Sequence, residues 1–199
     1  MTRIKMCGLT ALSDIYEANS LAPDYIGFVF AKKSRRYLDP GKAALLKKAL
    51  KPGIRAVGVF VDEDPLYIRS LAEAKIIDMV QLHGTEDEDY IKRLRELTSA
   101  PIIKAFQIKS LKDLSRVETC SADHILLDSG TGSGQTFNWE LLSETGKPYF
   151  LAGGLTPDNV GRAVSLLHPY GVDVSSGIET GGKKDALKMR RFMEAVQGS

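Results

Sequence analysis

The sequence of 199 residues is poor in cysteine and contains no long apolar run. Its two cysteines, Cys7 and Cys120, cannot form a disulfide framework and do not lie in a C-x-x-C motif, which excludes the disulfide-rich secreted class and predicts a reducing compartment. No segment approaches the roughly 18 apolar residues of a membrane span, and the N-terminal segment has no signal-peptide pattern. We therefore expect a soluble, cytoplasmic protein.

The chain also lacks an excess of charge of either sign. It has 27 Lys and Arg against 25 Asp and Glu, which gives a net charge of +2. This balance does not favour duplex DNA or an anionic membrane as a partner. Glycine and proline are near their average frequencies, which excludes collagen-like and low-complexity chains. We predict one globular domain, residues 1–199, without nucleic-acid or membrane partners, and the sequence leaves monomer or homodimer open.

Eight short apolar runs alternate with amphipathic stretches along the whole chain. The expected strands are residues 3–7, 25–30, 54–61, 78–83, 102–106, 124–128, 149–152 and 172–175. Helices are expected to begin at Asp39-Pro40, Asp64-Pro65 and Thr156-Pro157, where a capping residue precedes a proline. Alternating strands and helices predict a parallel sheet, and eight strands can close into a barrel. The predicted fold is α/β, a (β/α)8 TIM barrel of minimal length, with about 25 residues for each unit.

In such a barrel the active site lies where the strands end, at their carboxyl termini. Two glycine-rich turns follow the seventh and eighth strands, where barrels of this type commonly bind phosphate through backbone amides. They contain Gly153 and Gly154, and Ser175, Ser176 and Gly177. Each turn alone could be only a turn, but together they favour a phosphorylated substrate.

Cys7 and Asp128 end two non-adjacent strands and are the candidate base and acid. Alternatively, Cys7 is a small buried apolar residue and Asp128 a loop cap. His83 ends the fourth strand, as either a structural or a substrate-binding histidine. Lys5 lies within the first strand, where a buried ion pair is more expected than a Schiff base, and Asp173 is a possible partner.

Two loops at the same end of the barrel carry further signals. Residues 32–37 form a basic loop, which is either a solvated surface or the source of a carboxylate-binding arginine. Residues 129–135 are rich in glycine but lack the ending of a nucleotide-binding P-loop, so a lid is expected there. His124 and His168 are expected at other parts of the barrel, which argues against a histidine-rich metal site.

These residues together resemble the phosphoribosylanthranilate isomerase family. The matching motifs are residues 5–10 (KMCGLT), 27–30 (GFVF), 34–37 (SRRY), 59–61 (VFV), 80–84 (VQLHG), 127–129 (LDS), 134–139 (GQTFNW), 152–155 (AGGL) and 173–179 (DVSSGIE). They occur in order over nearly the whole chain, with one at almost every strand end. Arg35 stands where proline is frequent in the family, but no departure falls on Cys7, Asp128 or Arg36.

The resemblance implies a (β/α)8 barrel enzyme of tryptophan biosynthesis. Its reaction is the Amadori rearrangement of N-(5-phosphoribosyl)anthranilate to 1-(2-carboxyphenylamino)-1-deoxyribulose 5-phosphate. It implies Asp128 as the general acid, Cys7 as the general base and Arg36 as the ligand of the anthranilate carboxylate. His83 and Asp173 would contact the substrate, and the two glycine-rich turns would hold its phosphate. Neither a metal nor an organic cofactor is expected.

Two alternatives remain at this point. The related isomerase of histidine biosynthesis performs the same rearrangement on a doubly phosphorylated substrate, but an aspartate would be expected in place of Cys7. A barrel that binds phosphosugars without catalysis is the second alternative, and the Cys7–Asp128 combination argues against it.

Overall fold

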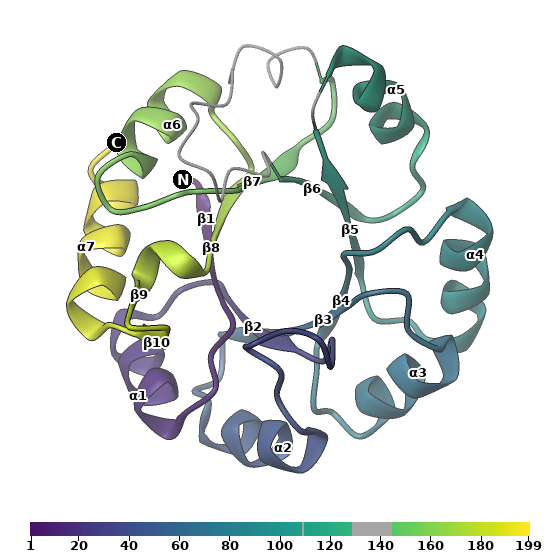
Figure 1. Cartoon of the computed structure of the whole chain (residues 1–199), viewed down its shortest axis with the longest axis horizontal. Helices are drawn as coiled ribbons and strands as arrows, with labels where there is room; N and C mark the ends of the chain where they lie inside the picture. Colours follow the sequence, from purple (N-terminus) through teal and green to yellow (C-terminus); the bar gives the residue numbers. More distant parts are fainter. Residues whose placement is uncertain (109, 129–144) are drawn as a thin grey trace.

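The computed structural model describes residues 1–108, 110–128 and 145–199. Eight parallel strands follow one another around a closed barrel, and helices surround it (Figure 1). The strands are β1 (Arg3–Cys7), β2 (Tyr25–Val29), β3 (Arg55–Phe60), β4 (Met79–Leu82), β5 (Ile102–Gln107), β6 (His124–Asp128), β7 (Tyr149–Ala152) and β8 (Gly171–Val174). The predicted barrel is confirmed, and the expected strand bounds are met to within one residue at each end.

The outer ring contains α1 (Leu12–Leu21), α2 (Pro40–Ala49), α3 (Pro65–Glu73), α4 (Glu88–Leu97), α5 (Leu111–Thr119), α6 (Val160–Leu167) and α7 (Ala186–Gln197). Asp39 and Asp64 cap α2 and α3 as expected, because their carboxylates accept backbone amides of the first turn. The expected start at Thr156-Pro157 is wrong by three residues. Residues 157–159 form a turn before α6, in which Asn159 Oδ1 accepts a hydrogen bond from the amide of Thr156 and Thr156 Oγ1 accepts one from the amide of Asp158.

Apolar side chains fill both sides of the barrel wall. The interior group consists of Tyr25, Val57, Met79, Ile103, Ala105, Leu126, Phe150 and Ala152. A larger group packs between the strands and the helices, so the strands are buried on both faces. This double burial explains why the strands are almost continuously apolar in sequence.

The barrel closes where β1 pairs with β8, with Lys5 opposite Asp173. Lys5 Nζ lies 2.9 Å from Asp173 Oδ1, and the lysine side chain is fully buried. This confirms the expected partner of Lys5. Beyond β8 the chain forms a 3-10 turn, η2 (Ser176–Ile178), and a short hairpin that the sequence did not predict.

The hairpin consists of β9 (Glu179–Thr180) and β10 (Lys183–Lys184), antiparallel to each other. In Figure 1 it lies beside α1 and α7, next to the end of β8. Within the three described segments, no helix has both the length and the apolar character required to cross a membrane.

Candidate active site

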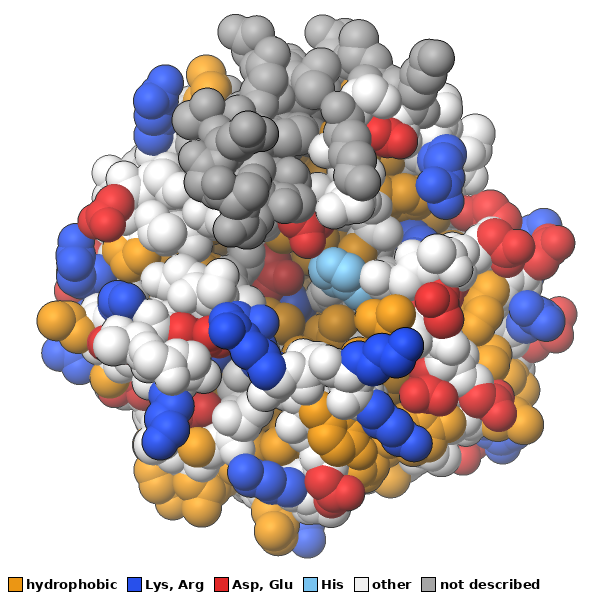
Figure 2. All heavy atoms as spheres, viewed as in Figure 1, with side chains coloured by type: hydrophobic (Ala, Val, Ile, Leu, Met, Phe, Trp, Pro, Cys, Tyr) orange, Lys and Arg blue, Asp and Glu red, His pale blue; other side chains and the backbone are white. Residues whose placement is uncertain are grey.

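A cavity of about 490 Å³ opens at the carboxyl ends of the strands. Figure 2 shows this face hollowed at its centre, with a histidine and acidic side chains on the wall of the hollow. Nine of the ten predicted site residues line the cavity: Cys7, Arg36, His83, Asp128, Gly153, Gly154, Asp173, Ser175 and Ser176. The fold therefore brings together residues that are separated by up to 169 positions in the sequence.

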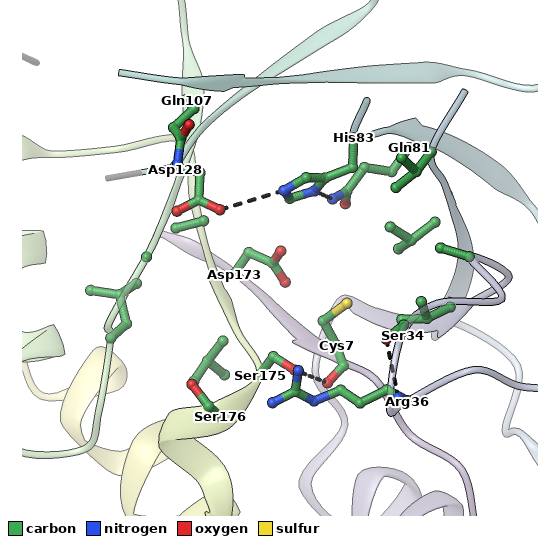
Figure 3. Close-up of a pocket in the computed structure, with 18 of the residues that line it drawn as sticks. Cys7, Ser34, Arg36, Gln81, His83, Gln107, Asp128, Asp173, Ser175 and Ser176 are labelled. Carbon is green, nitrogen blue, oxygen red and sulfur yellow. Dashed lines mark hydrogen bonds and ion pairs between the residues drawn. The ribbon is translucent and has the colours of Figure 1, made fainter. Parts of the chain in front are cut away.

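Cys7 ends β1 and is buried at the floor of this cavity. Its sulfur packs against the backbone of Gly27 on β2, where a Cβ atom would come within 2.6 Å of Sγ. Its carbonyl oxygen accepts a hydrogen bond of 3.0 Å from Ser175 Oγ. These contacts from β2 and from the turn after β8 hold the thiol in place, with its sulfur directed into the cavity (Figure 3).

The charge on Cys7 is governed by opposing effects. Burial raises the pKa of the thiol, while the ammonium groups of Lys5 and Lys184 act to lower it. Burial dominates, so the pKa of Cys7 lies above its usual range. Burial alone would lower the pKa of Lys5, but Asp173 and Cys7 outweigh it and raise this pKa. A charged ammonium therefore stands beside the thiol on the same strand.

Asp128 ends β6 and belongs to a chain of polar side chains. Its Oδ2 lies 3.4 Å from His83 Nε2, and His83 Nδ1 lies 2.9 Å from Gln81 Nε2. Figure 3 shows the histidine between the carboxylate and the amide, with Asp173 between Asp128 and Cys7. His83 thus contacts the candidate acid directly, a contact that sequence reasoning did not anticipate.

Arg36 enters the cavity from the loop after β2. Its Nε and one terminal nitrogen donate to Glu179, at 2.6 and 2.9 Å. One edge of the guanidinium is therefore engaged, while its remaining donors are available for the fork-like binding of a carboxylate. Gly8 lies directly beneath, because a Cβ atom there would be 2.4 Å from Arg36 Cδ.

Glu179 is a buried anion among cations. Besides Arg36, it accepts hydrogen bonds from Lys184 at 2.8 Å and from the exposed Arg35 at 3.3 Å. Burial alone would raise the pKa of Glu179, but the hydrogen bonds from Arg36 and Lys184 lower it. Burial in turn lowers the pKa of Lys184, against the opposing effect of Glu179. This cluster fixes the hairpin that follows β8 to the loop that carries Arg36.

The two glycine-rich turns meet at one side of the cavity. Gly153 and Gly154 both have positive φ, +93° and +64°, which a residue with a side chain rarely adopts. Gly177 does not line the cavity. A Cβ atom there would lie 1.8 Å from the carbonyl oxygen of Leu155, so glycine lets the turns after β7 and β8 pack together.

Some residues lie elsewhere or outside the described part of the chain. His124 stacks on Tyr170 near the amino-terminal end of the barrel, away from the cavity, as expected. In the described segments no cluster of three or more His, Cys, Asp or Glu is placed to hold a metal ion. The expected lid, residues 129–135, lies outside the described residues.

Sequence reasoning missed Gln81, Glu179 and Lys184. Gln81 lies two residues before His83, and this spacing places both side chains on the same face of a strand. That signal was available from the sequence. The positions of Glu179 and Lys184 depend on the hairpin after β8, for which the sequence has no comparable signal.

In this fold, ionisable side chains at the carboxyl ends of the strands are the catalytic groups, and they occur here around one cavity. The chain is therefore a (β/α)8-barrel enzyme. It matches the family model described as N-(5'-phosphoribosyl)anthranilate (PRA) isomerase over residues 4–195. The chain belongs to this family, the isomerases of tryptophan biosynthesis.

The sequences of individual relatives match this chain over all or nearly all of their length. The chain is 42% identical to an N-(5'-phosphoribosyl)anthranilate isomerase of Caldanaerobacter subterraneus, covering 100% of this chain and 99% of the relative. It is 45% identical to that of Endomicrobium trichonymphae, covering 95% of each. The crystal structure of the Thermotoga maritima enzyme superimposes with a TM-score of 0.90 at 36% identity, covering 100% of both chains.

Proposed function

We propose that this isomerase rearranges N-(5'-phosphoribosyl)anthranilate with Asp128 as the general acid and Cys7 as the general base. The observation that carries this assignment is that Cys7 and Asp128, from non-adjacent strands, line one cavity with Arg36 and the glycine-rich turns. A solved relative, 35% identical, holds reduced 1-(o-carboxyphenylamino)-1-deoxyribulose 5-phosphate. That ligand has a carboxyphenyl group and a phosphate, the two anionic groups that these features suit.

The first role of the cavity is to hold both ends of the substrate. The amides of the two turns that contain Gly153, Gly154, Ser175 and Ser176 bind the phosphate, and Gly177 lets these turns pack together. Arg36 binds the carboxylate with the donors that Glu179 leaves available. Binding at both ends orients the sugar so that C1 and C2 lie between the acid and the base.

Asp128 starts the reaction by donating a proton to the ring oxygen of the ribose. The bond between C1 and this oxygen breaks, and the lone pair of the anthranilate nitrogen forms a C1–N double bond. His83 beside Asp128 stabilises the carboxylate that remains. Figure 3 draws Asp173 between Asp128 and Cys7, and this position suits a contact with the opened sugar.

Cys7, as the thiolate, then removes the proton from C2. The electron pair of this C–H bond forms a C1–C2 double bond, and the iminium electrons return to nitrogen. The resulting enolamine loses its hydroxyl proton from the C2 oxygen and gains a proton at C1, which gives the ketone. Because the iminium itself accepts the electrons, the proposal includes neither a metal nor an organic cofactor.

The test is turnover of purified protein, followed by the loss of fluorescence of phosphoribosylanthranilate without added metal. Cys7→Ser and Asp128→Asn should each lower kcat by at least roughly 10²-fold. Cys120→Ser is the matched control, because Cys120 is the buried residue that follows α5, does not line the cavity and should be replaceable. No turnover by the wild type would refute the function. Near-normal rates of Cys7→Ser would refute the role of Cys7 alone.

Further parts of the proposal concern the molecule as a whole. We propose one domain over residues 1–199, supported by the pairing of β1 with β8. The two free cysteines support a cytoplasmic location. A dimeric relative from Thermotoga maritima has also been solved as monomers, so either a monomer or a homodimer is proposed here. A small molecule, rather than nucleic acid or membrane, is the proposed partner.

A further inference from the structure

The proposed mechanism assigns no role to Gln81, which is buried in the wall of the cavity. Its side chain is 1% exposed and extends from β4 to the ring of His83. Gln81 Nε2 lies 2.9 Å from Nδ1, and on the other side of the ring Nε2 faces Asp128 at 3.4 Å. Figure 3 shows this chain of three side chains, which ends at the candidate acid.

The chemistry of the amide determines where the ring carries its proton. The structure orients the Gln81 amide with its nitrogen toward His83, and an amide nitrogen donates hydrogen bonds and does not accept them, so in this orientation Nδ1 of His83 is the acceptor. A neutral imidazole with an accepting Nδ1 carries its proton on Nε2. His83 Nε2 lies 3.4 Å from Asp128 Oδ2, which is longer than an ordinary hydrogen bond, and catalytic contacts of this length often tighten when substrate binds.

We propose that Gln81 is a positioning residue that holds His83 in the neutral tautomer with its proton on Nε2. This inference rests on the proposed role of Asp128 as the acid. An imidazolium beside Asp128 would favour the carboxylate and remove the proton that the acid must deliver. A neutral N–H donor leaves that proton in place and strengthens its hydrogen bond as negative charge develops on Asp128.

Burial supports a positioning role over a purely structural one. Gln81 lies in register between Val59 of β3 and Ile103 of β5, among apolar residues. Its Oε1 is buried and has no hydrogen-bond partner among the described residues. A buried amide with an unpaired oxygen is unfavourable, and an apolar side chain of similar size would fill the space better. The contact with His83 is what distinguishes glutamine here.

The direct test is the ¹⁵N NMR spectrum of the imidazole rings at one fixed neutral pH. The chain has three histidines, so His83→Asn assigns the His83 signals, while His124 and His168 serve as internal controls. The wild type should show an unprotonated Nδ1 and a protonated Nε2 for His83. In Gln81→Glu the carboxylate accepts from Nδ1, so Nδ1 should become protonated. In Gln81→Leu the His83 signals should report a mixture of tautomers.

Kinetics connect the tautomer to the reaction. Gln81→Glu and Gln81→Leu should lower kcat about tenfold to hundredfold with a much smaller change in KM, since the lost contact acts on the acid and not on binding. Gln197→Glu is the matched control for charge. It adds the same carboxylate at an exposed position on α7, outside the cavity, and should leave the His83 spectrum unchanged.

Several results would overturn the proposal. A wild-type spectrum with Nδ1 protonated would do so without any variant, even if the variants failed to fold. An altered spectrum with an unaltered kcat in Gln81→Leu would show that the tautomer is set but does not matter. Absence of turnover in the wild type would instead refute the proposed function, and the spectrum would still report whether Gln81 fixes the tautomer.

Discussion

Replacing Asp173 by asparagine should destabilise the barrel strongly, because it leaves a buried ammonium without its counter-ion. The Lys5 side chain is 0% exposed and that of Asp173 is 9% exposed, and the two charged atoms are 2.9 Å apart. Removing one partner of a buried ion pair typically costs about 3–5 kcal/mol. We expect Asp173→Asn to lie near the lower end, about 3 kcal/mol, because the amide oxygen of asparagine can still accept a hydrogen bond from the Lys5 ammonium.

The reverse substitution should be milder. Lys5→Met leaves Asp173, which lines the open cavity and can be solvated there, so a loss of about 1–2 kcal/mol is expected. The double variant Lys5→Met/Asp173→Asn removes both charges and should be more stable than Asp173→Asn alone. The loss of unfolding free energy in the double variant should therefore be smaller than the sum of the two single losses by about 1–3 kcal/mol.

Urea unfolding followed by circular dichroism measures these differences as free energies of unfolding. Glu73→Gln is the matched control, because it removes a carboxylate from an exposed pair with Arg69 on α3, with side chains 60% and 44% exposed. That change should cost no more than about 0.5 kcal/mol. The reasoning fails if Asp173→Asn is as mild as Glu73→Gln, or if the double variant equals the sum of the singles.

Three further predictions concern the cavity. Glu179→Gln should raise KM roughly tenfold with a smaller effect on kcat, because Arg36 loses the anion that orients it; steady-state kinetics measure both. Gly177→Ala should destabilise the fold by about 1–3 kcal/mol in urea, since its methyl group has no room, whereas Gly146→Ala, with its nearest atom at 3.9 Å, should be almost neutral. Finally, kcat/KM should rise as pH increases through the usual thiol range and above it, because burial raises the pKa of Cys7 and the thiolate is the base.

Each of these predictions has a contrary result. An unchanged KM in Glu179→Gln would mean that Glu179 does not orient Arg36 for binding. Equal stabilities of the two alanine variants would contradict the tight packing at Gly177. For the pH profile, a kcat/KM that falls throughout the thiol range would contradict Cys7 as the base.

The pKa of Cys7 also affects the stability of the fold. The folded state favours the neutral thiol, so any stabilisation from Cys7 should decrease, not increase, as pH rises above the pKa of the unfolded thiol.

The fold was largely predictable because its strands are short, apolar and buried on both faces. A run such as Tyr25–Val29 is stable only where apolar layers cover both of its faces, and eight such runs form the closed barrel. The expected helix start at Thr156-Pro157 differs from the start of α6 by three residues. Thr156 Oγ1 accepts the amide of Asp158 and its carbonyl accepts the amide of Val160, as at a helix start, but the regular helix begins only at Val160.

Within the site, position along a strand predicted the residues better than it predicted their contacts. The strand-end rule identified Cys7, Asp128 and His83 as residues of one cavity. It could not show that His83 lies against Asp128, because such a contact depends on the register between β4, β5 and β6. The strand-end rule also could not predict the hydrogen bonds of Glu179, because they depend on a hairpin whose residues carry no alternating pattern.

The closure of the barrel by Lys5 and Asp173 also has a consequence for biosynthesis. These residues are 168 positions apart, and Ser175 holds the carbonyl of Cys7 over the same separation. A ribosome adds about 5–20 residues per second, so roughly 8–34 seconds pass between the synthesis of Cys7 and the synthesis of the residues that complete its surroundings. During that interval the growing chain carries a thiol whose final neighbours on β8 have not yet been made. Activity should consequently appear late and abruptly during translation.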